Sequence, residues 1–337
     1  MPQGRNDADF SRPSGLTMRL SIVIPAHNVE SLIERAIGSA VAAAPVGTEI
    51  VVVDDGSNDS TKAVAARLMG RWPVPLRLVA HPEGRNLGPG ATRNRGVAAA
   101  TGDLIAFLDA DDEYLSHRFA ADVPWLERNA GVDAVCGVTR IVHESETESP
   151  ATLELPADTP PARVLAELLR ERFWHADALT VRRSLWDRAG GFPTHLRMAE
   201  DCHLWFRMAI LGRIVPSPER RPVAVYRRRP GSAHVGGLES KRWLLRAMVE
   251  TAKWTRATGQ SRPVRREVSL AARRYFVKVA SDALAERRPD IARDCLTIAA
   301  RHLGWQFWLD RRVARRVLSV WRSGLPRAGD AGPPPTT

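Results

Sequence analysis

One segment of the chain gathers carboxylates at a single point: Asp109-Ala110-Asp111-Asp112, directly after the apolar run 104–108. Such a run is typical of a buried strand in a parallel sheet, and open α/β sheets bind ligands at the carboxyl ends of their strands. Three aspartates within four residues repel one another unless a cation offsets their charge. An Asp-x-Asp pair at a strand end suits a hard divalent ion that keeps sites open for substrate phosphates. An acidic turn without a metal is the alternative.

Two further apolar runs end in polar residues. The run 19–25 leads into Pro25-Ala26-His27-Asn28, and the run 49–53 leads into Asp54-Asp55-Gly56-Ser57. Helical spacing over 30–44, 61–69 and 88–100 separates strands predicted at 19–25, 49–53, 76–80 and 104–108. This alternation predicts an α/β fold with a mostly parallel sheet and helices on both faces.

The second half of the chain has a mixed pattern. We expect strands at 132–142, 178–182 and 223–226, and helices at 163–173, 184–189 and 200–211. An acidic, Ser/Thr/Pro-rich loop spans 144–159, and helical patterns dominate from 239 to 321. The predicted organisation is a disordered leader (1–17), a catalytic domain (18–235), a basic helical region (236–323) and a Pro/Gly-rich disordered tail (324–337).

Five motifs in order resemble those of family 2 glycosyltransferases of the GT-A type. They are the three strand ends, the segment Asn86-Leu87-Gly88-Pro89-Gly90-Ala91-Thr92-Arg93-Asn94-Arg95-Gly96, and Gly190-Gly191-Phe192 followed by Glu200-Asp201-Cys202-His203-Leu204-Trp205. The resemblance covers about residues 18–232. It implies a GT-A (Rossmann-like) fold with a helical C-terminal extension, and transfer of a sugar from a nucleotide-diphosphate donor with inversion at the anomeric carbon.

The resemblance also implies a donor site. Asp54 would accept hydrogen bonds from the base, because charge-assisted bonds to a carboxylate are short and strong; an Asx turn that caps the next helix is the alternative for 54–57. Arg93 would reach the donor phosphates, unless it forms a surface salt bridge. The expected donor contacts are Pro25, Ala26, Asn28, Glu30 (near the ribose), Asp54, Asp55, Ser57, Asn86, Gly88, Arg93, Asp109, Ala110 and Arg229.

The metal and the base follow from the same resemblance. Asp111 is the first candidate ligand of Mg²⁺ or Mn²⁺, with Asp109 beside it, and Asp112 is expected to cap the following segment. Asp201 is the expected general base, because one well-placed carboxylate can take the proton of the acceptor hydroxyl. Glu200 would orient the acceptor. An acidic pair that caps the helix is the alternative for Glu200 and Asp201.

Two positions depart from the family pattern. His27 stands where many relatives have an aromatic residue. Arg229, in Tyr226-Arg227-Arg228-Arg229-Pro230-Gly231-Ser232, stands where many have a histidine. Either His234 substitutes for that histidine or the arginines contact the diphosphate, and bidentate guanidinium binding favours the arginines.

Charge is distributed unevenly along the 337 residues. The net charge is +11, and from Ser232 onward 21 Lys and Arg face 9 Asp and Glu, so the basic excess belongs to the C-terminal third. A stripe of Trp305, Leu309, Val313, Val317 and Trp321 lies among arginines there. Residues 305–322 therefore predict a helix that lies on an anionic membrane surface, or one that packs on its own domain.

The cellular compartment is predicted from three features that the sequence lacks. The three cysteines have no metal or disulfide spacing, no run is apolar enough to span a membrane, and the first 17 residues lack the apolar centre of a signal peptide. We expect a cytoplasmic protein, peripheral at the inner face of the cell membrane if the stripe binds lipid. The acceptor would be a sugar, a lipid-linked sugar or a polymer, and segments 144–159 and 173–177 would line its side.

Three other functions are considered. A sugar-nucleotide pyrophosphorylase would need a basic Gly-rich loop after the first strand, which 25–30 lacks. A nucleic-acid-binding protein would place its basic surface at the functional site, whereas the excess here lies away from the strand ends, so no nucleic-acid partner is expected. A non-catalytic nucleotide-sugar-binding relative is disfavoured because Asp109, Asp111 and Asp201 are present.

Overall fold

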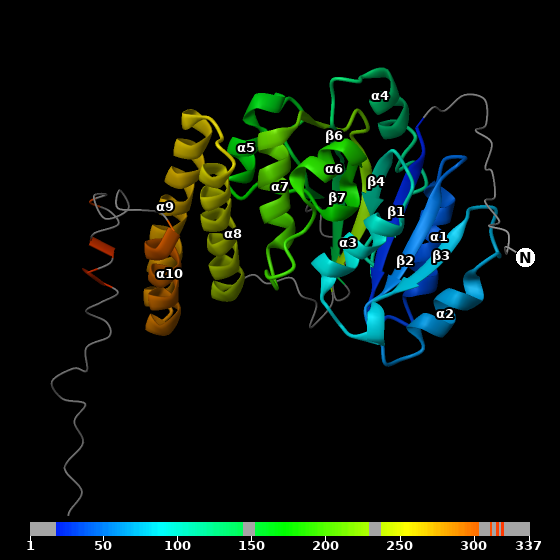
Figure 1. Cartoon of the computed structure of the whole chain (residues 1–337), viewed down its shortest axis with the longest axis horizontal. Helices are drawn as coiled ribbons and strands as arrows, with labels where there is room; N and C mark the ends of the chain where they lie inside the picture. The colour runs from blue at the N-terminus through cyan, green and yellow to red at the C-terminus, as the bar shows by residue number, and fades with distance from the viewer. Residues whose placement is uncertain are drawn as a thin grey trace, which may run out of the picture. The chain divides into compact units, whose positions relative to one another are not determined.

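The computed structural model describes residues 18–143, 152–228 and 237–302, with residues 311, 315, 316, 318 and 319 (Figure 1). It divides into two compact units: the described parts of Met1–Glu167, Arg172–Thr194 and Leu211–Pro230, and those of Leu168–Glu171, His195–Ile210 and Gly231–Thr337. Several predictions lie outside the described residues: the leader 1–17, the segment with Arg229 and His234, the five-residue apolar stripe within 305–322, and the tail from 324.

The first unit contains a seven-stranded sheet in the order β10-β6-β9-β4-β1-β2-β3. Only β9 runs antiparallel to its neighbours; the other pairings are parallel. This confirms the predicted α/β class with a mostly parallel sheet. The strands are β1 (Leu20–Ala26), β2 (Glu49–Asp54), β3 (Leu76–Ala80), β4 (Leu104–Phe107), β6 (Ala134–Cys136), β9 (Leu179–Arg182) and β10 (Ile214–Pro216).

Helices pack on both faces of this sheet, because both faces are apolar. Side chains alternate along a strand, and Ile22 and Ile24 of β1 face α1 (Ile33–Ala43) in one buried cluster. The intervening Val23 faces α3 (Pro89–Ala99), where a Cβ on Gly96 would lie 2.3 Å from its Cγ1. Glycine thus allows α3 to approach the sheet closely. Shorter helices are α2 (Thr61–Leu68), α4 (Asp122–Arg128), α5 (Pro161–Leu168) and α6 (Arg183–Ala189).

A second sheet was not predicted. It has four strands in the order β5-β11-β7-β8, namely β5 (Glu113–Tyr114), β11 (Pro222–Arg228), β7 (Val138–His143) and β8 (Thr152–Leu153). The prediction of one strand over 132–142 is wrong, because the chain changes sheets between β6 and β7. At that point a Cβ on Gly137 would lie 2.7 Å from Cγ2 of Val223, and the Gly137 amide donates to the carbonyl oxygen of Ala178 over 2.8 Å.

The second unit is helical. It contains α7 (Glu200–Leu211) except its last residue, α8 (Leu238–Ala257), α9 (Arg262–Ala285) and α10 (Pro289–His302). Buried apolar side chains join the last three helices, and Lys241 pairs with Asp282 between α8 and α9 at 2.7 Å. Within the part of the chain that the structure describes, no helix is both long and apolar enough to cross a membrane.

Candidate active site

The ends of three parallel strands meet at one edge of the larger sheet. Ala26 of β1 pairs with Asp54 of β2, Val23 of β1 pairs with Phe107 of β4, and the amide of Leu108 donates to the carbonyl oxygen of Val23 over 3.0 Å. Three of the motifs predicted from the sequence therefore lie side by side, as the parallel-strand rule requires.

The loops after β1 and β2 are joined by hydrogen bonds. The Asp55 amide donates to the carbonyl oxygen of Ala26 (2.8 Å), the Asn28 amide donates to Oγ of Ser57 (3.1 Å), and the Asn58 amide donates to Oδ1 of Asn28 (3.0 Å). Asn28 has φ 51°, a left-handed conformation that asparagine tolerates better than most residues. The two segments thus form one ordered surface next to Pro25, with Glu30 exposed beside it.

The two aspartates after β2 are buried and have different partners. Oδ1 of Asp54 accepts the main-chain amide of Ser57, three residues further along the chain, at 3.3 Å. The Asp55 carboxylate accepts the amides of Leu87 (2.7 Å) and Gly88 (3.0 Å). Asp55 therefore fixes the Gly-rich loop before α3 against the β2 loop.

Gly56 allows this contact between the loops. It has φ +69°, and a Cβ there would lie 2.5 Å from the carbonyl oxygen of Gly84 and 2.8 Å from the amide nitrogen of Asn86. Any larger residue would push the segment with Asn86 and Gly88 away from the sheet edge. The expected donor residues of the β1, β2 and Gly-rich loops are thus brought together.

Arg93, on α3, is buried and reaches the β4 loop. Its Nη2 lies 2.6 Å from Oδ1 of Asp109, and its guanidinium lies over the ring of Phe192, 5.3 Å from the centroid. The Gly-Gly-Phe motif is bound to the same helix, because the Asn94 side chain accepts from the amide and donates to the carbonyl of Phe192, both at 2.8 Å. The alternative of a surface salt bridge is therefore wrong in its location: Arg93 is buried, and its salt bridge with the partly exposed Asp109 lies at the β4 loop.

Four side chains with metal-ligating atoms gather behind the β4 loop: Asp109, Asp112, His175 and Asp177, whose candidate ligand atoms all lie within 4.8 Å of one another. The Asp109 amide donates to Oδ1 of Asp177 at 3.0 Å, and Nδ1 of His175 lies 3.1 Å from Oδ2 of Asp177. The ring of His175 stacks on Tyr226 of β11 with centroids 4.6 Å apart. Both sheets therefore contribute to the position of the cluster.

The charges in this cluster shift three pKa values. Burial, followed by the charges of Asp177, Asp109 and Asp111, raises the pKa of Asp112 to about 11. Burial would lower the pKa of His175, but the charge and hydrogen bond of Asp177 and the charge of Asp109 outweigh it and raise the pKa to about 9. Burial would raise the pKa of Asp109, but Arg93 and His175 outweigh it and lower the pKa. Without a cation, Asp112 and His175 therefore hold their protons to higher pH than the same side chains do in water.

The residues of the cluster fit a divalent cation. Asp112 and Asp177 are at most 1 % exposed. Oδ2 of Asp112 accepts no hydrogen bond from any residue that the structure describes, and Oδ2 of Asp177 has Nδ1 of His175 at 3.1 Å. Buried oxygens of this kind are costly unless a proton or a cation satisfies them. Carboxylate oxygens suit Mg²⁺ or Mn²⁺.

Asp111 and Asp112 behave differently from each other. The main-chain oxygen of Asp111 accepts from Nη2 of Arg35 at 3.1 Å, and its carboxylate is not among the four clustered groups, so its role as a metal ligand stays a prediction. Asp112 does not cap the following segment as expected. It is buried, and its Oδ1 accepts the main-chain amide of Arg227 at 2.8 Å, which attaches β11 to the β4 loop.

Sequence reasoning did not assign His175 and Asp177 to this place; it expected 173–177 on the acceptor side. The signal was the direction of β9. Because β9 is antiparallel to β4, with Thr180 opposite Ala106, the residues that precede β9 lie at the carboxyl end of β4. A His-x-Asp sequence directly before an antiparallel strand was therefore the available clue.

Glu200 and Asp201 lie in the second unit, in the first turn of α7. Glu200 is buried, and Oδ1 of Asp201 accepts the amide of Cys202 at 2.7 Å. Ala199, directly before them, has φ 57°, so the chain turns sharply into the helix. Burial, then the charges of Arg207 and His195, lowers the pKa of His203 on the same helix to about 3.

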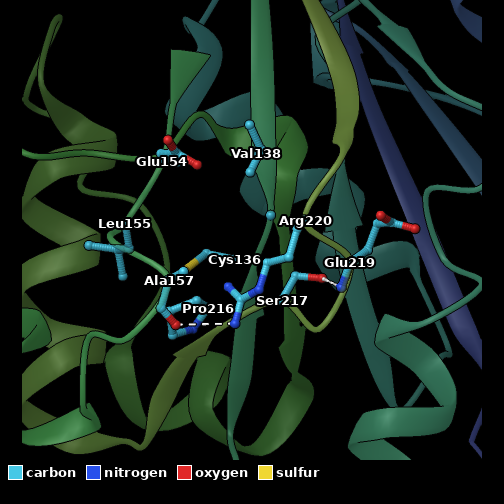
Figure 2. Close-up of a pocket in the computed structure, with 10 residues that line it drawn as sticks. Cys136, Val138, Glu154, Leu155, Ala157, Pro216, Ser217, Glu219 and Arg220 are labelled. Carbon is cyan, nitrogen blue, oxygen red and sulfur yellow. Dashed lines mark hydrogen bonds between the residues drawn. The ribbon is translucent and has the colours of Figure 1, made fainter.

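A cavity of about 200 Å³ lies elsewhere in the first unit, beyond the ends of β6 and β10 (Figure 2). Register places Cys136 of β6 opposite Leu179 of β9, two strands from β4. The segment after β8 and the segment after β10 close the cavity, and Nη2 of Arg220 donates to the carbonyl oxygen of Ala157 at 3.1 Å. The lining residues are Cys136, Gly137, Val138, Glu154, Leu155, Ala157, Pro216, Ser217, Glu219 and Arg220.

Comparison with known proteins gives consistent results. Residues 21–188 match the family model described as glycosyl transferase family 2. A curated relative, the succinoglycan biosynthesis protein ExoO of Rhizobium meliloti (strain 1021), is 35 % identical over 195 residues, which are 54 % of this chain and 53 % of ExoO. The chain spans about half the length of the first curated relatives that it matches.

Two solved structures have a similar fold. S. aureus TarS 1–349 in complex with UDP-GlcNAc has a TM-score of 0.55 at 17 % identity, over 85 % of this chain and 89 % of that one. The mannosyltransferase PcManGT from Pyrobaculum calidifontis, in complex with GDP-Man and Mn²⁺, has a TM-score of 0.53 at 20 % identity, over 93 % and 90 %. At these identities the likeness establishes the fold alone.

Proposed function

We propose that this chain, which belongs to glycosyl transferase family 2, transfers a sugar from a nucleotide-diphosphate donor to an acceptor hydroxyl, with inversion at the anomeric carbon. The observation that carries the proposal is the meeting of three polar loops at one sheet edge, beside a cluster of three carboxylates and a histidine that includes the buried Oδ2 of Asp112, to which no described residue donates. Such an edge offers a nucleoside pocket and a diphosphate site next to each other.

The nucleoside would bind where the β1 and β2 loops are joined. Asp54 would accept hydrogen bonds from the base, with Pro25, Ala26 and Asn28 alongside and Glu30 near the ribose. Asp55 would act by holding the segment with Asn86 and Gly88 in place, and Ser57 by fixing Asn28. The family resemblance supports these assignments, and the joined loops support the preorganisation.

The diphosphate would bind at the β4 loop with Mg²⁺ or Mn²⁺, held by Asp109 and Asp111 with Asp112, His175 and Asp177 behind them. A bound divalent cation offsets the charge that develops on the leaving diphosphate. Arg93, which already pairs with Asp109, would share its charge with the phosphates, and Arg229 would add a second guanidinium. Ala110 is small and buried, which leaves room beside the phosphates.

The acceptor hydroxyl would lose its proton to Asp201, with Glu200 orienting it. Replacement Asp201→Asn removes the base without changing the shape of the side chain, so turnover should fall by about 10²–10⁴-fold while nucleotide affinity stays within twofold. Asp187→Asn, in α6, the helix that precedes α7 along the chain, is the control. An active Asp201→Asn variant would refute the role of Asp201.

For the acceptor we propose a saccharide, free, polymeric or lipid-linked, in a polysaccharide pathway as in the relative named for succinoglycan biosynthesis. The cavity is lined in part by Glu154, Leu155 and Ala157, from one of the two segments expected to line the acceptor side, and it would bind a sugar unit of the acceptor. Membrane attachment through 305–322, at the inner face of the cell membrane, belongs to the same proposal. Liposome binding that is lost when Arg311, Arg315 and Arg316 are replaced would support it.

The decisive experiment is calorimetric titration with UDP, GDP, CDP and dTDP, with and without Mn²⁺. We expect one nucleotide to bind with metal dependence, and Asp111→Ala to abolish that dependence. Asp103→Asn is a matched control, because Asp103 precedes the same strand at its opposite end and contacts the Arg19 amide. If none of the four nucleotides binds to the wild type, the proposal is wrong.

A further inference from the structure

Arg118 is an unusual residue in the first unit because its charged side chain is fully buried, with 0 % exposure. Its Nη1 lies 2.6 Å from Oδ2 of Asp122, which is equally buried. Removing two charges from water costs more than their pairing returns in many proteins. A buried pair therefore calls for an explanation beyond stability.

The guanidinium makes one contact that explains its position. Its Nε donates to the main-chain oxygen of Asp177 at 2.9 Å, and the carboxylate of Asp177 accepts the amide of Asp109 at 3.0 Å. Asp177 is thus held on one side by Arg118 and on the other by the β4 loop. A continuous path of two hydrogen bonds joins the buried pair to the metal-site loop.

The surroundings of Arg118 fix its orientation. The guanidinium lies over the rings of Phe119 (4.6 Å) and Tyr114 (5.4 Å), and the hydroxyl of Tyr114 donates to the main-chain oxygen of Phe107 at the end of β4. The same support therefore attaches to β4 and to the segment before β9. These are the two segments that carry Asp109 and Asp177.

The acidic partner is fixed as well. Asp122 also accepts from Oγ1 of Thr180 at 3.2 Å and from the hydroxyl of Ser217. With its carboxylate held by β9 and by the segment after β10, Asp122 gives Arg118 a single stable geometry. Because the Arg118–Asp122 pair is held in one geometry, it can hold the main chain of Asp177 in one position.

We propose that Arg118 is a positioning residue: through Asp177 it sets the geometry of the β4 loop and thereby the affinity of the site for its divalent cation. The inference rests on the proposed function for the identity of that cation. Groups behind metal ligands commonly change metal affinity by about 10–100-fold when replaced. Arginine suits the task because its planar fork serves Asp122 and Asp177 at once, which a single ammonium serves less well.

Two variants test the proposal. The double variant Arg118→Met/Asp122→Asn removes both buried charges together, so neither is left unpaired. Arg118→Lys keeps a charge for Asp122 but loses the fork, and it carries the test if the double variant does not fold. The control is Arg182→Met: Arg182 donates from Nε to the main-chain oxygen of Val132 at 2.7 Å, so it also anchors main chain in this unit, away from the cluster.

Two measurements separate positioning from general stability. Hydrogen exchange followed by mass spectrometry reports the Asp109 amide in peptides that cover 104–112, and electron paramagnetic resonance reports Mn²⁺ affinity in the presence of the nucleotide diphosphate that the wild type binds. In the Arg118 variants we expect exchange of these peptides to accelerate about tenfold and Mn²⁺ affinity to fall about 10–100-fold. In Arg182→Met both should stay within twofold of the wild type.

Unchanged exchange over 104–112 in a folded Arg118 variant would overturn the proposal, and so would equal acceleration in Arg182→Met. If the wild type binds no Mn²⁺, the proposed function fails. The exchange measurement still decides whether Arg118 positions Asp109, so the two failures can be distinguished.

Discussion

The carboxylates of two loops at the same sheet edge differ in how far the protein itself satisfies their hydrogen-bonding capacity. After β2, Asp54 and Asp55 accept main-chain amides within their own surroundings. After β4, Asp112 has a buried Oδ2 to which no described residue donates a hydrogen bond, and Asp177, buried beside it, has only the imidazole of His175 near its Oδ2. The carboxylates of the β2 loop thus have hydrogen-bond donors within the protein, whereas the β4 loop needs a proton or a cation to satisfy its buried carboxylate oxygens.

This difference separates the two tasks of a sugar-nucleotide site. A nucleoside is recognised best by groups that are already in place, because ordering them on binding costs affinity. A cation needs concentrated negative charge, and that charge destabilises the protein until the cation arrives. We therefore expect substitutions in the β2 loop to affect stability, and substitutions in the β4 loop to affect activity.

Within the two loops, the largest expected effect is that of Asp111→Asn. The substitution removes one negative charge from the crowded loop, so turnover should fall by about 10²–10³-fold while the free energy of unfolding is unchanged or rises. Steady-state kinetics and urea denaturation measure the two quantities. A variant that loses stability and keeps its activity would reverse the comparison.

Asp55→Ala should give the opposite result. Its carboxylate holds the amides of Leu87 and Gly88, and hydrogen bonds to charged groups contribute about 1.5–3 kcal/mol. We expect the free energy of unfolding to fall by about 2–3 kcal/mol, measured by urea denaturation. Asp59→Ala, on the more exposed continuation of the loop, should cost less. Equal losses would mean that Asp55 does not hold the Gly-rich loop.

The sequence was sufficient for the parallel half of the fold. Apolar runs such as 49–53 and helical spacing such as that of α1 are strong signals of strands and helices. Asp54 and Asp109 could be predicted as site residues because each stands at the carboxyl end of such an apolar run. Strands of two or three residues carry no periodicity, so β5, β8 and β10 went unseen. Of the four groups in the β4 cluster only Asp109 was predicted as a metal ligand, and the reason is a different one: His175 and Asp177 reach the cluster through the reversed direction of β9, a tertiary property.

The pH dependence of stability tests the state of the cluster without a cation. The folded pKa values of His175 (about 9) and Asp112 (about 11) lie above their unfolded values, so the folded protein holds protons that the unfolded chain releases as pH rises. The contribution of His175 is full below about pH 6.5 and is lost by about pH 9; that of Asp112 is lost progressively from about pH 4 to 11.

We therefore expect the free energy of unfolding of the metal-free protein to fall between pH 6.5 and 9, by about 3 kcal/mol through each of the two groups. The measurement is urea denaturation in the presence of a chelator. The double variant His175→Gln/Asp112→Asn should show a flatter profile over this range. A flat profile in the wild type would mean that the β4 loop is already complete, which would remove the contrast with the β2 loop.

The smallest expected effect is that of Ser57→Ala, which asks how completely the β2 loop is fixed. The substitution removes the acceptor for the Asn28 amide but leaves the Asp55 amide bonded to Ala26. Water can replace Oγ at this partly exposed position, so the free energy of unfolding should fall by only about 0.5–1 kcal/mol. Nucleotide affinity, measured by calorimetry, should fall less than tenfold, because the remaining hydrogen bonds keep both loops in place. A loss of more than a hundredfold would show that the pocket depends on one hydroxyl and is ordered by its ligand, as the β4 loop is.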